Sequence, residues 1–115
     1  MKLHELKTVS PFFESLGPDK KNFEVRYNDR NIQRGDYLVL SHWNGQNEFT
    51  GQSALIKVTY RIPLSVVPNF VLASGPTITY NMGYWEVFGL NFVLDGDKVF
   101  WKRAQALKQA HALAK

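Results

Sequence analysis

Residues 17–40 read GPDKKNFEVRYNDRNIQRGDYLVL, and they join the densest run of charge in the chain to two of its clearest strand patterns. The segment 23–27 alternates apolar and charged side chains with the period of two that is typical of a β-strand. Gly35-Asp36 is a turn signal, and the apolar run 37–43 that begins directly after it predicts a second strand. This stretch therefore indicates a β-rich domain.

The two faces of the first of these strands differ in chemistry. Phe23, Val25 and Tyr27 share one face, whereas Glu24 and Arg26 share the other. Because apolar side chains gain free energy on leaving water, we predict that the apolar face is buried in the core. Core packing is then the stronger interpretation of Tyr27, and stacking on a ligand is the weaker one.

The N-terminal segment predicts a strand followed by a short helix. Residues 2–7 alternate roughly between apolar and polar side chains. Ser10 is suited to cap a helix and Pro11 to occupy its first position. Gly17-Pro18 ends the pattern, so the predicted helix has about two turns.

Two further strands and a terminal helix are predicted downstream. Residues 55–62 alternate as a strand, and the longest strand pattern covers residues 83–94. Gly89 inside the latter predicts a bulge or a close backbone approach. The connection over residues 63–82 is long enough to contain a short helix or hairpin of its own. The Ala-rich residues 96–115 predict a helix.

These elements predict an α+β fold. About five strands with little helix between them favour a small mixed or antiparallel sheet that closes into a pseudo-barrel, with a short N-terminal and a C-terminal helix. A doubly wound parallel sheet would need crossover helices, for which the sequence has too few candidates. We predict one domain over residues 1–95, with a basic helix over residues 96–115 packed on it or appended to it.

Composition narrows the possible chemistry. The 115-residue chain has no cysteine, which excludes a disulfide framework, a thiol nucleophile and a cysteine-based metal site. His4, His42 and His111 show no metal-ligand spacing, so neither a metal nor another cofactor is predicted. No apolar run approaches the roughly 18 residues that a membrane span needs, and no signal peptide is evident. We expect a cytoplasmic protein without a membrane partner.

Charge is distributed unevenly along the chain. Residues 1–35 carry seven Lys or Arg against five Asp or Glu, and residues 96–115 carry five against one. Residues 36–95 carry two against four, so both ends are basic and the middle is acidic. Basic segments suit a polyanion such as nucleic acid, although a solvated surface explains the same pattern.

Short motifs follow one another in order over about residues 3–94. They are His4-Glu5-Leu6-Lys7, Gly17 followed by Lys21-x-x-Glu24-x-Arg26 within the run 21–30, Gly35-Asp36 with the apolar strand after it, Phe49-Thr50-Gly51, Val58-Thr59-Tyr60, Gly83-Tyr84 and Gly89-Leu90. Their order and spacing resemble the ASCH domains of the PUA-like superfamily, and most closely a small uncharacterised ASCH-like family common in bacteria and phages. The terminal helix lies outside the resemblance.

The resemblance implies a PUA-like pseudo-barrel and an RNA-associated binding function, because PUA-like domains commonly bind RNA and some relatives read modified bases. The expected partner is RNA or a nucleotide, and modified DNA stays open. The candidate nucleic-acid-binding residues are Lys21, Glu24, Arg26, Arg30, His4 and Lys7.

Each candidate has a chemical reason. Lys21 offers a point charge for phosphate, whereas Arg26 and Arg30 offer planar forks for bidentate contact. Tyr27 and Trp43 are candidates for stacking an unpaired base if they are exposed. The competing interpretation is that Glu24 and Arg26 pair with neighbouring side chains.

Two other functions remain open. Some ASCH relatives are amidohydrolases that remove an acyl group from a cytidine, with a chemistry resembling a lysine that activates a threonine hydroxyl. Lys21 matches that lysine, but Glu24 stands at the threonine position, so the mechanism does not carry over intact. Glu24 as a general base beside Lys21 is the remaining catalytic hypothesis, and binding without catalysis is preferred. A protein-interaction function through the terminal helix is the third possibility.

Overall fold

The computed structural model describes residues 1–64 and 85–115. The predicted connection 63–82 falls outside these residues from residue 65 onward, as do the first two residues of the predicted strand 83–94. In chain order the elements are β1 (Leu3–Thr8), β2 (Phe23–Tyr27), β3 (Tyr37–Trp43), β4 (Phe49–Pro63), β5 (Trp85–Val93), β6 (Phe100–Lys102) and α1 (Arg103–Leu113).

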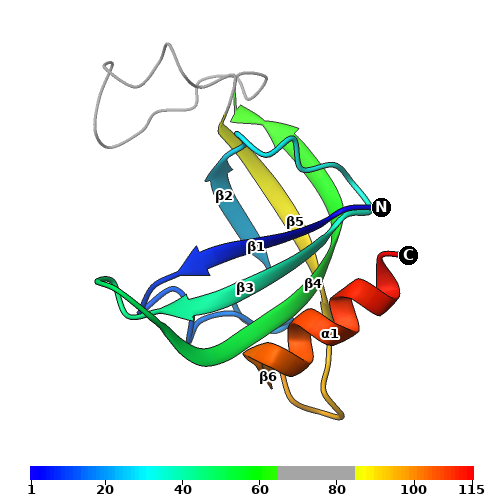
Figure 1. The fold of residues 1–115 in the computed structure, drawn as a ribbon. Coiled ribbons are helices and arrows are strands. Elements are labelled where there is room, and N and C mark those ends of the chain that lie inside the picture. The colour runs from blue at the N-terminus through cyan, green and yellow to red at the C-terminus, as the bar shows by residue number, and fades with distance from the viewer. Residues whose placement is uncertain (65–84) are drawn as a thin grey trace.

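The strands form one mixed sheet. Its order is β1-β3-β4-β5-β2, and β6 pairs with β4 off this path. β1 runs parallel to β3, and the other pairs are antiparallel. The sheet curls into a half-barrel with β1 and β2 at its two ends, and α1 lies against its outer face (Figure 1). The predicted α+β fold with a small mixed sheet and a C-terminal helix is confirmed.

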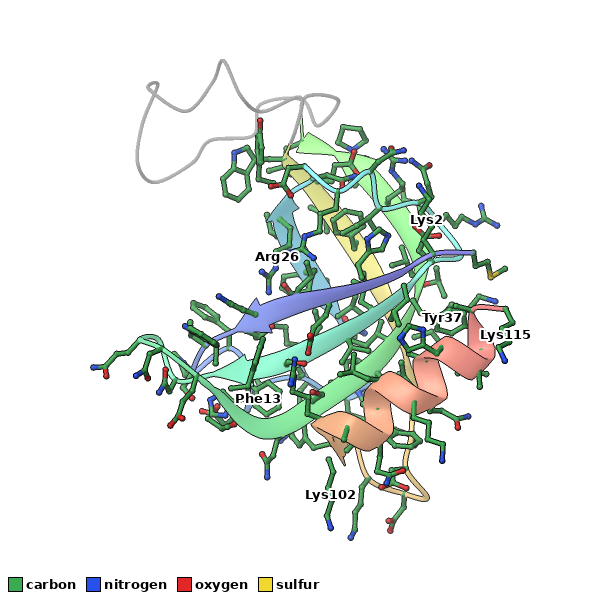
Figure 2. The ribbon with its side chains drawn as sticks, in the orientation of Figure 1. Lys2, Phe13, Arg26, Tyr37, Lys102 and Lys115 are labelled. Atoms are coloured by element: carbon green, nitrogen blue, oxygen red, sulfur yellow. The ribbon has the colours of Figure 1, made fainter. Side chains whose placement is uncertain are left out.

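The core has two parts, one on each face of the sheet. Inside the curl, buried side chains from the strands meet the loop residues Phe13 and Leu16. On the outer face, Tyr37 lies between β3 and α1 (Figure 2). There, Ala106 and Ala110 of α1 are fully buried. Because both side chains are small and lie four residues apart, they let the helix approach the sheet closely.

A bulge in β4 faces Gly89 of β5. Val58 pairs with Leu90 and Tyr60 with Gly89, so Thr59 is the extra residue. A Cβ atom added to Gly89 would lie 3.0 Å from the Cβ of Tyr60. The predicted bulge or close approach at Gly89 is therefore confirmed. The bulge also changes which way β4 faces, and Tyr60 is 57% exposed although it shares the strand parity of buried Val58.

The predicted N-terminal helix is wrong. The segment that begins at Ser10 folds as successive turns, in which the Phe13 amide donates to the Val9 carbonyl and the Leu16 amide to the Phe13 carbonyl. The run between Pro11 and Gly17 is too short to repay the cost of helix nucleation. Burial of Phe13 and Leu16 in the core instead fixes its path.

The C-terminal helix starts later than predicted, at Arg103 instead of Gly96. Residues 95–98 form a turn, with Gly96 at a φ of 65°, and β6 then pairs with residues 52–54 of β4. β5 pairs with β4 only as far as Leu55, so β6 satisfies backbone groups that would otherwise lack a strand partner. Within the described part of the chain, no helix combines the length and apolar character needed to cross a bilayer.

Candidate functional site

The side chains of β2 face the opposite way from the prediction. Phe23, Val25 and Tyr27 are 45%, 42% and 44% exposed, whereas Glu24 is only 3% exposed. Glu24 pairs directly with Phe88 of β5, which is fully buried in the inner core. Directly opposed residues of an antiparallel pair share a face, so the register turns Glu24 inward. The predicted burial of Phe23, Val25 and Tyr27 was wrong for this reason.

Two cations make the burial of Glu24 possible. The Lys21 ammonium lies 2.5 Å from Glu24 Oε1, and Arg26 Nε donates to Glu24 Oε2 at 2.8 Å. A buried carboxylate without such partners would cost several kcal/mol, on the order of the penalty for any unpaired buried charge. The interpretation that Glu24 and Arg26 pair with neighbouring side chains is thus confirmed, and Lys21 joins them.

Arginine side chains from β2 and from the loop that follows it reach β1 at the other end of the sheet. Arg26 Nη2 donates to the carbonyl of Lys7 at 2.9 Å and to Thr8 Oγ1 at 3.0 Å, and Arg30 Nη1 donates to the carbonyl of Glu5 at 2.7 Å. Figure 2 shows Arg26 between β2 and β1. Among the described residues β1 pairs only with β3, so these arginines replace a strand neighbour on its other edge.

A cleft of about 1240 Å³ lies where β1 and β2 face each other. Five of the six predicted site residues line it, namely Lys7, Lys21, Glu24, Arg26 and Arg30. The exposed face of β2 lines it as well, so cationic and aromatic side chains meet at one surface. These five residues, which the sequence predicted as one site, are therefore neighbours in the folded protein.

His4 is the predicted site residue that lies elsewhere. Its Nε2 atom is 3.0 Å from Asp36 Oδ2, and both residues are buried. Burial alone would raise the pKa of Asp36, but hydrogen bonds from the backbone amides of Gln33 and Lys2 and from His4 lower it below its ordinary value. This pair fixes the turn before β3, which is a structural task.

Sequence reasoning missed three aromatic residues of the cleft. Phe12, Phe49 and Trp85 all line it, and Phe12 is 55% exposed. Phe12 lies in the segment for which the sequence predicts a short helix that does not form, so the pattern does not indicate the direction of its side chain. Phe49 lies at the start of β4, six residues before the predicted start of that strand.

A second polar cluster lies at the end of β3. Ser10 Oγ donates to Glu14 Oε1 at 2.6 Å and lies 2.9 Å from His42 Nε2, while Thr50 Oγ1 lies 2.8 Å from His42 Nδ1. The His42 ring stacks on the Phe13 ring, with the two ring centroids 4.5 Å apart. Ser10 thus binds side chains instead of capping a helix. In the described ranges, no group of three His, Asp or Glu side chains has the arrangement of a metal site.

Two comparisons with known proteins give matches. A family model described as "Domain of unknown function (DUF3850)" matches residues 3–74. An "Uncharacterized 12.9 kDa protein in GpA 3'region" of Escherichia phage P2 is 40% identical over 58 residues, which are 50% of this chain and 52% of the phage protein. The chain thus spans about half the length of that relative. The family match includes every lining residue discussed above except Trp85.

Proposed function

We propose that this chain, which belongs to the DUF3850 family, binds RNA or a nucleotide through an unpaired base and its phosphate. The family is described as a domain of unknown function, so the proposal is argued from the cleft. One observation carries this proposal. The edge strand β2 exposes Phe23, Val25 and Tyr27 at the cleft, beside the cations Lys21 and Arg26.

The exposed aromatic face supports base stacking. A folded protein gains free energy by burying such side chains, and contiguous exposed apolar surface commonly marks a binding site. Tyr27 also lies edge-on to Trp85, with ring centroids 6.0 Å apart, so the two rings form a fixed aromatic corner. Aromatic rings of this kind stack with unpaired bases of any sequence, typically for about 1–3 kcal/mol per base.

The charged cluster supports phosphate binding. Lys21, Glu24 and Arg26 together carry one net positive charge, and Glu24 holds both cations in place. The side chains of Lys21 and Arg26 remain 19% and 28% exposed, so each keeps donors that can reach a ligand. Fixed cations lose little side-chain entropy on binding, which favours a specific phosphate position.

The half-barrel is compatible with a PUA-like fold, and we include in the proposal that the domain is of the ASCH type. The support is the ordered set of motifs around Lys21, Glu24 and Arg26, which the fold gathers at the cleft. Modified DNA with an extrahelical base presents the same chemistry as single-stranded RNA and is tested beside it.

The experiment measures binding to short single-stranded RNA, structured RNA and duplex DNA at several salt concentrations. Fluorescence anisotropy of the labelled nucleic acid reports the binding. Tyr27→Ala is expected to weaken binding about tenfold at all salt concentrations. Lys21→Gln, which keeps a donor for Glu24, is expected to weaken binding and to flatten its salt dependence.

Matched controls are available in the same chain. Tyr60 is also exposed but does not line the cleft, and Lys20 lies beside Lys21 at a different surface. Tyr60→Ala and Lys20→Gln are expected to bind as the unchanged protein does. Equal loss in the control and cleft variants, or no binding to any polymer or nucleotide, would contradict the proposal.

The contact between Lys21 and Glu24 favours a second candidate, a hydrolase acting on a modified nucleoside. In that reaction Glu24 would take a proton from water as the water oxygen adds to the acyl carbon, and Lys21 would stabilise the negative charge that develops on the acyl oxygen. The bond between the acyl carbon and nitrogen would then break as the proton on Glu24 passes to the departing amino group, so that the products are a carboxylic acid and cytidine. Both carboxylate oxygens of Glu24 already accept hydrogen bonds, so it would have to release one of them first. Turnover of an acylated cytidine that disappears in Lys21→Gln would favour this function over binding alone.

A further inference from the structure

We propose that Trp43 and Phe49 form a second base-stacking site, so that the ligand is a single strand of several nucleotides that crosses the edge of β1. This inference rests on the proposed function, because it extends the same cleft. Trp43 is the last residue of β3 and Phe49 the first of β4, and the ligand they fit is a single-stranded polynucleotide, either RNA or DNA.

The first observation is that the two aromatic rings of Trp43 and Phe49 lie between two cations. The Lys7 ammonium lies 3.8 Å from the centroid of the Trp43 ring, and Trp43 meets Phe49 edge-on at 5.0 Å. The guanidinium of Arg103 lies 3.9 Å from the centroid of the Phe49 ring. Two aromatic rings between two cations offer faces for bases together with donors for the phosphates that join them.

The second observation is continuity with the first site. Lys7 and Phe49 line the same cleft as Phe23 and Tyr27, so the pair Trp43 and Phe49 shares residues with the first site. The cleft volume of about 1240 Å³ exceeds the range of about 300–1,000 Å³ that is usual for small-molecule pockets. A single nucleotide would leave much of this surface unused, whereas a short strand would follow it.

The third observation is that Glu5 holds Arg103 in its place against Phe49. Arg103 donates to both carboxylate oxygens of Glu5, at 2.7 and 2.8 Å. Burial would raise the pKa of Glu5, but hydrogen bonds from Arg103 and Ser41 lower it below the ordinary value, so the carboxylate stays charged. Arg103 is the first residue of α1, and the helix thereby fixes the cation that supports Phe49.

Lys7 gives the site a way to open. Its ammonium covers Trp43 in the free protein, and lysine keeps four rotatable bonds with which to move away. A base that stacks on Trp43 takes the place of the ammonium, which then lies within reach of a phosphate of the same strand. The ammonium thus exchanges its contact with the Trp43 ring for a contact with phosphate, so little binding free energy is lost when the strand displaces it.

The test is a length series. Uridine and thymidine oligonucleotides of one, two, three, four and six units are titrated by calorimetry against the unchanged protein, Trp43→Ala, Tyr27→Ala and Lys7→Gln. Affinity is expected to rise over the first units and then to level off. Trp43→Ala is expected to bind the six-unit strands about tenfold more weakly and the single nucleotide unchanged.

The variants separate the two proposals. Tyr27→Ala is expected to weaken binding of the single nucleotide and of the long strands alike. Lys7→Gln is expected to reduce the salt slope of the long strands more than that of the single nucleotide, because the second phosphate lies beside Lys7 only in a strand that reaches Trp43. If affinity does not grow with length, or if both Trp43→Ala and Lys7→Gln bind long strands normally while Tyr27→Ala does not, this inference is overturned and the proposed function stands. If no length binds to any variant or to the unchanged protein, the proposed function itself fails.

Folding of the variants is checked independently. Trp43 also packs against Phe49, so Trp43→Ala is compared with Trp43→Leu in thermal unfolding. Lys7 is exposed, and its change to Gln removes the charge without opening a cavity. A salt slope that falls more for the long strands than for the single nucleotide in Lys7→Gln supports the inference even where Trp43→Ala is unstable. Uridine and thymidine arms of the series distinguish RNA from DNA as the source of the strand.

Discussion

Glu24 stands directly opposite Phe88 in the pairing of β2 with β5, and both side chains are buried. A carboxylate thus occupies a core position of the sheet. Glu24→Gln keeps the shape but leaves Lys21 and Arg26 facing a neutral amide, so we expect a loss of about 1–3 kcal/mol in the free energy of unfolding. Urea unfolding measures this loss. Glu48 is exposed, so Glu48→Gln is the control, with an expected change within about 0.5 kcal/mol. Equal stability of the two variants would contradict the buried cluster.

The pair of His4 and Asp36 predicts a dependence of stability on pH. The pKa of Asp36 is lower in the folded protein than its ordinary value of 3.8. Such a group stabilises the fold fully above that value, and its contribution is lost as the pH falls through the lower folded pKa. Unfolding free energies of the unchanged protein and Asp36→Asn should therefore differ at pH 7 and converge below about pH 3.8. A difference that stays constant down to pH 2.5 would count against this account.

Gly89 predicts an intolerance to even a methyl group. In Gly89→Ala the new Cβ would lie 3.0 Å from the Cβ of Tyr60, which is attached directly to the bulged strand. We expect the midpoint of thermal unfolding to fall, by an amount that corresponds to about 1–3 kcal/mol of overpacking. Gly17→Ala is the matched control, because its new Cβ would meet only the Lys20 side chain, at 3.8 Å or more. A similar melting temperature for both variants would disprove the close approach.

The packing of α1 predicts a contrast between two alanines of the same helix. Ala110 is fully buried against the outer face of the sheet, whereas Ala112 is exposed. Ala110→Leu should cost about 1–3 kcal/mol of folding free energy because the space is already filled, while Ala112→Leu should change it by less than about 0.5 kcal/mol. Guanidinium unfolding followed by far-UV circular dichroism measures both. If both variants lost less than about 0.5 kcal/mol, α1 would not pack closely against the sheet at Ala110.

The sequence predicted the position of a strand well where a turn signal stood next to a clear strand pattern. β3 covers the predicted residues 37–43 because the turn at Gly35-Asp36 marks where the strand begins and the apolar run marks its length. The alternation of residues 23–27 located β2 equally well. It could not say which parity faces the core, since that depends on β5, which is far away in sequence, and on the cations that neutralise Glu24.

Elements that exist only through distant partners escaped prediction. β6 covers three residues and is stabilised by pairing with residues 52–54. The turns from Ser10 onward follow the burial of Phe13 and Leu16, not the propensity of the segment. The candidate site was found in part because a resemblance grouped Lys21, Glu24 and Arg26, whereas Phe12 and Phe49 carried no local sign of their place at the cleft.

The arginine bridges between β2 and β1 also bear on how the protein behaves at high concentration. An exposed strand edge is a template on which a second chain can add a strand, and that is a route to aggregation. Arg26 and Arg30 occupy carbonyl groups of β1 and place positive charge beside them. In the described part of the chain, the two side chains therefore protect the edge of β1 from pairing with another copy, and their loss would first be seen as reduced solubility.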